Sequence, residues 1–179
     1  IRGNVAYRYE TIDITNITDN ASRDLLDEGG KNGVSSLEMG LSFDSRDNIF
    51  DTTKGDLLTS SWSIAGGPLG GDKDYWKFFG RASHYFPFAF GSVFEIRGRI
   101  GLADAYDDTK KVPIYDRFFA GGADTIRGYH ERKVGPVDPT SKDPLGGASL
   151  AVGNIEYTYP LFSFLKVAAF YDVGNVWEK

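Results

Sequence analysis

One arginine in a glycine-rich stretch is the strongest candidate for chemistry in this sequence. Arg127 carries a planar cation that can donate paired hydrogen bonds to a carboxylate. It lies in residues 116–136, DRFFAGGADTIRGYHERKVGP, where glycines allow backbone conformations that other residues resist: Gly121, Gly122 and Gly128. The same stretch carries apolar side chains that favour burial, namely Phe118, Phe119, Ile126 and Tyr129. We therefore expect it to fold inward and dock.

The remaining composition excludes several other kinds of chemistry. A net charge of -5 and a pI near 5.0 give no basic footprint for a nucleic-acid partner. The absence of cysteine excludes disulfides and thiolate metal sites, and His84 and His130 lie too far apart in sequence to indicate zinc. Asp44, Arg46 and Asp47 indicate a turn rather than a metal site, because they lack a ligand spacing. No cofactor and no metal are predicted.

Seven segments that could position the arginine alternate between polar and apolar residues, which is the pattern of a β-strand. None repeats apolar residues at helical spacing over a convincing length, so we predict an all-β chain. The segments are residues 3–14, 34–44, 57–66, 75–86, 92–102, 149–159 and 165–177.

The alternation fits either a soluble β-sandwich or a membrane barrel. The connections alternate in length, with long loops at residues 17–33 and 103–148 and tight turns at 87–91 and 160–164. Aromatic residues also gather near strand ends, as in an interfacial girdle: Tyr85, Phe86, Phe88, Phe90, Tyr157, Tyr159, Phe162 and Phe164. Both features favour an antiparallel transmembrane β-barrel. The acidic residues Asp19, Asp24, Asp27 and Glu28 are expected to be solvated on its extracellular face.

Seven strands do not close a bacterial barrel, and open sheet edges are not tolerated in hydrocarbon. We therefore expect residues 1–179 to be part of a larger barrel, with a long extracellular plug loop at about residues 103–148. Since the sequence starts at Ile1 without methionine, an upstream region is also expected.

Four blocks in order resemble the BamA-type outer-membrane protein assembly factors. The hallmark is the tetrapeptide Ile126-Arg127-Gly128-Tyr129, which matches the family's (V/I)RG(F/Y) signature in its sixth extracellular loop. The other blocks are LSFDSRDNIFDTTKG (41–55), the run from LGG to YFP (69–87), and LGGASLAVGNIEYTYPL (145–161) with AFYDVGNVW (169–177). The resemblance covers nearly the whole chain.

This resemblance implies a sixteen-stranded barrel in the outer membrane of a Gram-negative bacterium, of which these are the seventh to thirteenth strands. The seam strands and the periplasmic POTRA domains would lie outside this chain. The implied function is folding and membrane insertion of client β-barrel proteins. The implied partners are unfolded outer-membrane client proteins, outer-membrane lipid and, through the absent domains, accessory assembly lipoproteins and periplasmic chaperones.

In the family, the loop arginine inserts into the lumen and contacts acidic and aromatic residues of the strands that follow. The alternation independently places three candidates on the polar, lumen-facing side of their strands: Glu156, Phe170 and Asp172. Carboxylates beside the guanidinium and a ring against its flat face would hold the loop in place. The alternatives are that Arg127 is a solvated loop residue and that the two carboxylates only solvate the lumen.

Other functions remain open at the level of sequence. A TamA-like autotransporter assembly factor or a two-partner secretion transporter would share the loop motif. An outer-membrane enzyme such as a phospholipase would need a Ser-His pair on the outer face, and His84 has no suitable serine or asparagine beside it. A passive porin is disfavoured, since the long loop is suited to plug the lumen. No enzymatic activity is predicted.

Overall fold

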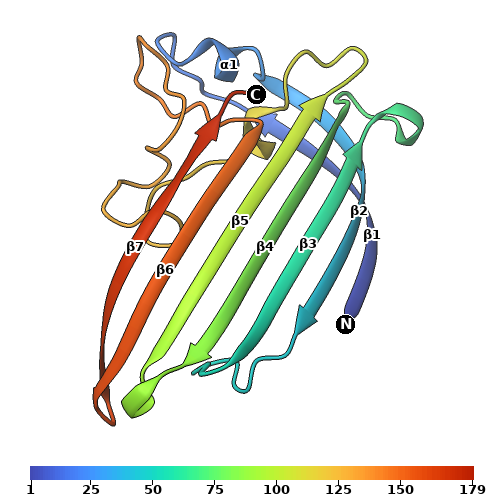
Figure 1. Ribbon diagram of the computed structural model, residues 1–179. Coiled ribbons are helices and arrows are strands. Elements are labelled where there is room, and N and C mark those ends of the chain that lie inside the picture. The colour runs from blue at the N-terminus through green and yellow to red at the C-terminus, as the bar shows by residue number, and fades with distance from the viewer.

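The computed structural model describes all 179 residues. Its strands form one sheet of seven antiparallel strands. Each strand pairs with the next along the chain, so that the sheet is a simple meander (Figure 1). The strands are β1 (Arg2–Ile14), β2 (Gly30–Asp44), β3 (Gly55–Ala65), β4 (Tyr75–Pro87), β5 (Val93–Ala105), β6 (Ser149–Phe162) and β7 (Leu165–Trp177).

The helical segments are short and lie in the connections. They are α1 (Arg23–Leu26) and the 3₁₀ turns η1 (Gly67–Leu69), η2 (Ala89–Gly91) and η3 (Ile114–Asp116). No helix of this chain has the length and apolar character needed to cross a membrane.

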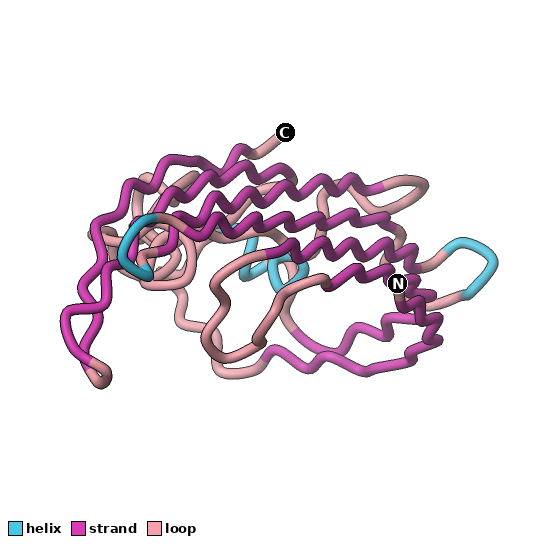
Figure 2. The backbone as a smooth tube through the Cα atoms, turned by 60° about the horizontal axis from the view of Figure 1, so that its bottom comes forward, coloured by secondary structure: helices cyan, strands magenta, loops and turns pink.

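The two faces of the sheet differ in chemistry, as the alternation predicts. One face is apolar and exposed; Leu41 on β2 is 59% exposed and Ile100 on β5 is 51% exposed. The other face carries the polar residues, and the sheet curves around it, so that the loops lie within the curve (Figure 2). A strand that is apolar on its outer face and polar on its inner face is typical of a membrane barrel, because lipid contacts one side and the lumen the other.

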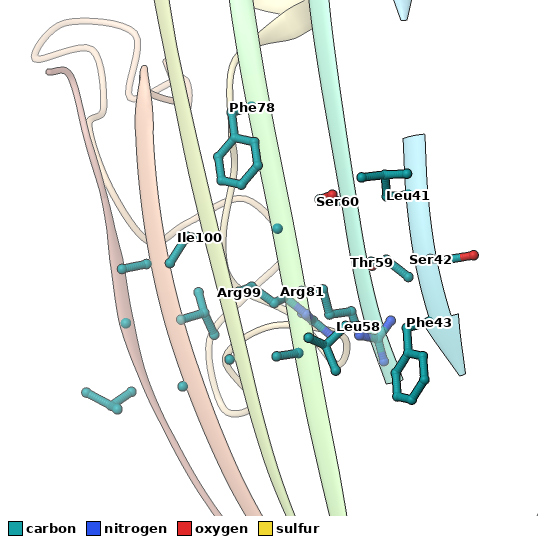
Figure 3. Close-up of a pocket in the computed structure, with 18 of the residues that line it drawn as sticks. Leu41, Ser42, Phe43, Leu58, Thr59, Ser60, Phe78, Arg81, Arg99 and Ile100 are labelled. Carbon is teal, nitrogen blue, oxygen red and sulfur yellow. The ribbon is translucent and has the colours of Figure 1, made fainter. Parts of the chain in front are cut away.

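Small residues leave a shallow groove of about 1010 Å³ across the apolar face (Figure 3). The register places Ser60, Gly80, Ala82, Gly98, Ala151 and Gly153 side by side on four neighbouring strands. Larger apolar side chains border the groove, including Leu41, Phe43, Leu58, Phe78 and Ile100. A side chain at Gly98 would meet no neighbour within 4 Å, so packing within this chain does not require glycine there.

The two longest connections lie at one end of the sheet and the two shortest at the other, as predicted, whereas residues 45–54 and 66–74 are similar in length. Residues 15–29, 66–74 and 106–148 connect strands at the end drawn uppermost in Figure 1, and residues 45–54, 88–92 and 163–164 at the opposite end. The buried apolar core lies at the long-loop end, between the inner face of the sheet and the 106–148 loop. It includes Val34, Tyr75, Phe118, Ile126 and Val176.

Three strand ends differ from the sequence prediction by three residues or more. β2 begins at Gly30 rather than at residue 34, and β5 and β6 end at Ala105 and Phe162 rather than at residues 102 and 159. The reason is that backbone pairing continues beyond the alternating segment: Asn32 still pairs with Ile12, and Lys31 with Asp13. The hydrogen-bonded ladder therefore extends past the part of the strand that side-chain pattern can identify.

Five of the eight aromatic residues predicted to form a girdle are exposed, whereas Tyr157 and Tyr159 are half-buried. Phe86, Phe88, Phe90, Phe162 and Phe164 are exposed near the short-turn end. Tyr85, however, lies on the polar face, because it shares its strand parity with Arg81 and Ser83 and pairs with Glu95 of β5. It lines a small polar pocket with Arg46 and Glu95 instead of contacting lipid.

The turn at residues 45–54 is held by the side chains that the sequence analysis identified. Asp44 accepts two hydrogen bonds from the Arg46 guanidinium, at 2.9 and 2.7 Å. The Asp47 carboxylate accepts from the backbone N–H groups of Thr53 and Lys54, at 2.9 and 3.2 Å, and from the Thr53 hydroxyl. Gly55 ends the turn with a φ of 107°, where a Cβ would collide with the Ser45 carbonyl.

Asp47→Ala is expected to open this turn and to raise amide hydrogen exchange at Thr53 and Lys54. Hydrogen bonds, first from the Thr53 hydroxyl, hold the pKa of the Asp47 carboxyl below its usual range. Because this pKa is lowered in the folded state, the stabilisation is present above the ordinary carboxyl pKa and is lost as pH falls through the lowered value. Wild-type exchange, corrected for its intrinsic pH dependence, should therefore stay slow until the pH is below the usual carboxyl range. Lys54→Ala, whose side chain makes no hydrogen bond, is the control; equal exchange in both variants would contradict this account.

Candidate functional site

The 106–148 loop folds back on itself before it meets the sheet. Short antiparallel bridges join Phe118 with Gly147 and Ala120 with Val134, so that two limbs of the loop run side by side. Phe118, Ala120 and Ile126 are buried against the inner face. The loop is therefore a packed element rather than a solvated connection.

A tight turn built on glycine presents the arginine. The Thr125 hydroxyl accepts from the backbone N–H of Gly121 at 2.9 Å and donates to its carbonyl at 2.8 Å. The backbone N–H of Gly122 donates to the carbonyl of Tyr129 at 3.0 Å. Gly121, Gly122 and Gly128 have φ values of 109°, 90° and 89°, which disfavour residues with a Cβ.

Arg127 forks onto Asp172 of β7. Its Nε and Nη2 donate to the two carboxylate oxygens at 2.7 and 2.8 Å, and its backbone N–H adds a third bond at 3.0 Å. The Asp172 side chain is only 2% exposed, whereas that of Arg127 is 24% exposed. The pKa of the Arg127 guanidinium is raised above its ordinary value, chiefly by the hydrogen bond to Asp172, so the cation stays charged.

Glu156 and Phe170 complete the contacts around the guanidinium; with Asp172 they lie on the inner face of β6 and β7, which is called the wall below. Arg127 Nη1 donates to Glu156 of β6. The ring of Phe170 on β7 lies 3.6 Å from the Arg127 Cζ, which is within the range of a cation–π contact. The structure thus brings together Arg127, Glu156, Phe170 and Asp172. That these contacts lock the loop stays a prediction.

The flanking motif residues behave differently from each other. Ile126 is 4% exposed and belongs to the core cluster. Tyr129 is 60% exposed, so the expectation that it would be buried is wrong. The reason is local: Gly128 turns the chain with a positive φ, and the Tyr129 carbonyl is held by the Gly122 N–H, so the backbone is fixed in the turn while the side chain stays exposed.

Asn154 is a site residue that sequence reasoning missed. Its side-chain N–H₂ donates to the Thr125 carbonyl at 2.7 Å and to Asp172 Oδ1 at 2.8 Å. Asn154 is buried and stands directly opposite Asp172 in the β6–β7 register. Its place on the polar face was readable from alternation, but its bond to a loop carbonyl depends on how the loop is folded.

Arg117 is a second anchor that the sequence did not reveal. Its Nε donates to the Val112 carbonyl at 2.7 Å, and its Nη1 donates to Asp24 at 2.5 Å and to the Leu145 carbonyl at 3.2 Å. One side chain thereby joins both limbs of the 106–148 loop to the 15–29 loop. Burial raises the pKa of the Asp24 carboxyl, but the hydrogen bonds and positive charges of Arg117 and Lys111 together outweigh burial, and the pKa is lowered.

Two of the four acidic residues of the 15–29 loop are therefore not solvated as expected. Asp24 pairs with Arg117, and Glu28 lies 2.7 Å from the Lys73 ammonium and is buried. Each finds a cation in a loop distant in sequence, and pairing across loops cannot be read from local composition.

Arg117→Ala is expected to separate the two loops and to expose residues 106–117 to protease, while the Arg127 contacts remain. It removes a shielded cation and leaves Asp24 with only Lys111 as partner. Limited proteolysis of the protein in detergent would measure the effect. Lys110→Ala, an exposed loop cation without a partner, is the control. Identical cleavage of wild type and the Arg117 variant would count against the second anchor.

His84 on β4 has a partner that the sequence analysis did not anticipate. Its Nδ1 lies 2.5 Å from Asp56 Oδ1, directly across the β3–β4 register. No hydroxyl group hydrogen-bonds to the ring.

Comparison with known proteins decides which family has this arrangement. A family model described as the Omp85 superfamily domain matches residues 1–179, the whole chain. This chain belongs to the Omp85 superfamily. It is a BamA-type barrel portion, and its location is the bacterial outer membrane.

Individual relatives of this Omp85 chain support the assignment. It is 33% identical over 170 residues to an outer membrane protein assembly factor BamA of Nitratidesulfovibrio vulgaris, covering 94% of this chain and 21% of the relative. It is 30% identical to a SAM50-like protein of Schizosaccharomyces pombe, covering 83% of this chain and 31% of the relative. The chain thus spans about a fifth to a third of the length of these relatives.

A solved structure shows the same fold. The crystal structure of BamA from Haemophilus ducreyi lacking POTRA domains 1–3 superposes with a TM-score of 0.71 at 21% identity. The match covers 82% of this Omp85 chain and 30% of that chain. The seven-stranded antiparallel sheet predicted from alternation is therefore confirmed as part of a BamA-like barrel.

Proposed function

We propose that this chain forms a wall and the plug loop of an outer-membrane protein assembly factor, which folds and inserts client β-barrel proteins. Family membership and the assembly-factor names of its relatives support this proposal. Its partners are then unfolded outer-membrane client proteins and outer-membrane lipid. Assembly lipoproteins and periplasmic chaperones would act through domains outside this chain.

The observation that carries the proposal is the set of contacts made by Arg127. A cation, two carboxylates, an aromatic ring and an amide converge on one loop tip. Both carboxylates of this cluster accept hydrogen bonds from Arg127, so its chemistry is suited to holding a position rather than to turnover. We infer that residues 126–129 fix the loop inside the barrel and preserve its shape while client strands are inserted elsewhere.

A complementation experiment tests the proposed function. The full-length protein, carrying either wild-type Arg127 or Arg127→Ala, replaces the native copy in a bacterial strain where that copy can be depleted. Wild type should sustain the amount of folded client barrels in the outer membrane, and the Arg127 variant should reduce it several-fold at equal protein level. Arg8→Ala, on the same face with only a 3.8 Å contact to Glu38, is the control.

The outcome also separates the proposal from its alternatives. If wild type failed to restore client barrels but restored export of a partner polypeptide, the secretion-transporter alternative would replace it. Robust hydrolysis of a fluorescent phospholipid by the purified protein would contradict the proposal that it is not an enzyme.

A further inference from the structure

Three arginines form a basic cluster on the inner face of β4 and β5, below the plug loop. They are Arg81, Arg97 and Arg99. Arg97 is neutralised locally, since its Nε and Nη2 donate to the Glu95 carboxylate at 2.8 and 2.9 Å. Neither Arg81 nor Arg99 has a carboxylate oxygen within 4.0 Å, although the chain as a whole is acidic. Neither guanidinium therefore forms an ion pair with a carboxylate of this chain.

The register makes this arrangement costly. Arg81 and Arg99 stand directly opposite each other on neighbouring strands. Like charges in directly opposed positions destabilise a sheet. In the close-up both side chains extend from their strands in the same direction, toward β3 (Figure 3). Nothing in the backbone forces arginine at either position.

Burial adds to the cost and indicates a missing partner. Arg99 is 8% exposed, and its only hydrogen bond is from Nη1 to the backbone carbonyl of Asp124. The Nε of Arg81 is buried and has no hydrogen-bond partner. A buried charged donor without an acceptor is unfavourable, and native structures normally satisfy it. Both guanidiniums thus have donors free for a further ligand.

The arginines line a cavity large enough for a small anion. Its volume is about 510 Å³, and its wall is completed by Phe79, Phe118, Phe119, Asp124, Thr125 and Leu150. The nearest carboxylates, those of Glu95 and Asp124, act on Arg99 only at longer range: Glu95 is paired with Arg97, and Asp124 accepts the Arg99 hydrogen bond through its backbone carbonyl. Lys77, farther along the same face of β4, is engaged by Asp116.

We propose that Arg81 and Arg99 form a binding site for a phosphate group. Two guanidiniums without an ion-pair partner suit the charge of about −1.5 to −2 that a phosphate group carries at neutral pH, whereas a carboxylate supplies only one charge. Planar guanidiniums also bind phosphate oxygens through paired N–H donors. The bound anion would lie beside Thr125 and Asp124 and would thereby connect the β4–β5 wall with the loop that carries Arg127.

Thermal unfolding of the full-length protein in detergent tests the site. Inorganic phosphate at pH 7 should raise the unfolding temperature saturably above the value in chloride of equal ionic strength. Arg81→Gln and Arg99→Gln should each weaken apparent phosphate affinity by about tenfold, the effect of losing one charge-assisted hydrogen bond. Arg8→Gln, an exposed arginine on the same face, should bind phosphate as wild type does. Broadening of the phosphorus-31 NMR line of phosphate by the wild-type protein gives a direct reading of binding if a variant fails to fold.

The controls identify the ligand. A soluble short-chain phosphatidic acid in place of inorganic phosphate distinguishes a lipid headgroup from the free ion, and preferential binding of either one supports the site. Equal stabilisation by acetate would overturn the phosphate assignment. Equal phosphate effects in Arg8→Gln and Arg81→Gln, or none in wild type, would overturn the site itself. These measurements report anion binding and not client insertion, so a negative result leaves the proposed assembly function untouched.

Discussion

Arg127→Ala is expected to release the plug loop from the wall and to lower the free energy of unfolding by about 3 kcal/mol. The alanine leaves the Asp172 carboxylate, 2% exposed, with Asn154 as its remaining side-chain partner. A buried charge that loses its counter-charge is far more costly than a surface pair, which is worth about 0–1 kcal/mol. The estimate is at the low end of the buried range because Arg127 itself is 24% exposed.

Asp172→Asn should have nearly the same effect from the other side of the contact. Asparagine keeps the shape of the side chain but removes the charge and one of the two acceptor oxygens that Arg127 binds. The measurements are urea unfolding in lipid vesicles, heat-modifiability on gels, and the amount of client barrels in the outer membrane. Arg8→Ala should change none of the three. If both site variants matched wild type in all of them, the loop would not be held by this pair.

Gly121→Ala is expected to disrupt the loop about as severely as loss of the arginine, although it removes no side-chain contact. Gly121 has a φ of 109°, which an L-residue adopts at a cost of about 1–2 kcal/mol. In addition, its Cβ would collide with the His130 carbonyl, a backbone group that cannot move aside without opening the turn. The Thr125 hydroxyl would then lose its two bonds to the Gly121 backbone.

Substitutions at two other glycines distinguish backbone strain from the steric collision of an added Cβ. Gly128→Ala meets nothing within 4 Å but has a φ of 89°, so only the backbone strain should appear, at about 1–2 kcal/mol. Gly98→Ala, with open space and an ordinary strand conformation, should be nearly neutral. Unfolding in vesicles should therefore rank the variants Gly121, Gly128, Gly98 from most to least destabilised. An equal effect at Gly121 and Gly98 would refute the role assigned to the turn.

Alternation along the strands predicted much of this site, for a physical reason. In a strand, side-chain direction follows residue parity, so the polar face at Glu156, Phe170 and Asp172 could be assigned without knowing the fold. The two ends of the sheet could be assigned as well, because in a meander successive connections lie at opposite ends. The resemblance of the tetrapeptide then indicated which loop residue meets that face.

What parity could not predict are contacts set by the path of the loops. Arg117 and Asp24 are 93 positions apart, and they meet only because the 15–29 and 106–148 loops fold together at the same end of the sheet. The bond from Asn154 to the Thr125 carbonyl depends on the glycine turn, as does the outward direction of Tyr129. The extra residues of β2 follow backbone pairing with β1, which side-chain chemistry does not report.

The central claim is that the Arg127–Asp172 pair holds the loop, and a double-mutant cycle tests it most directly. The free energy of unfolding is measured for wild type, Arg127→Ala, Asp172→Asn and the double variant of the full-length protein in lipid vesicles. We predict a coupling energy of about 1.5–3 kcal/mol, because removing the second partner costs little once the first is gone. Additive effects, within about 0.5 kcal/mol, would show that the two residues act independently and would contradict the claim.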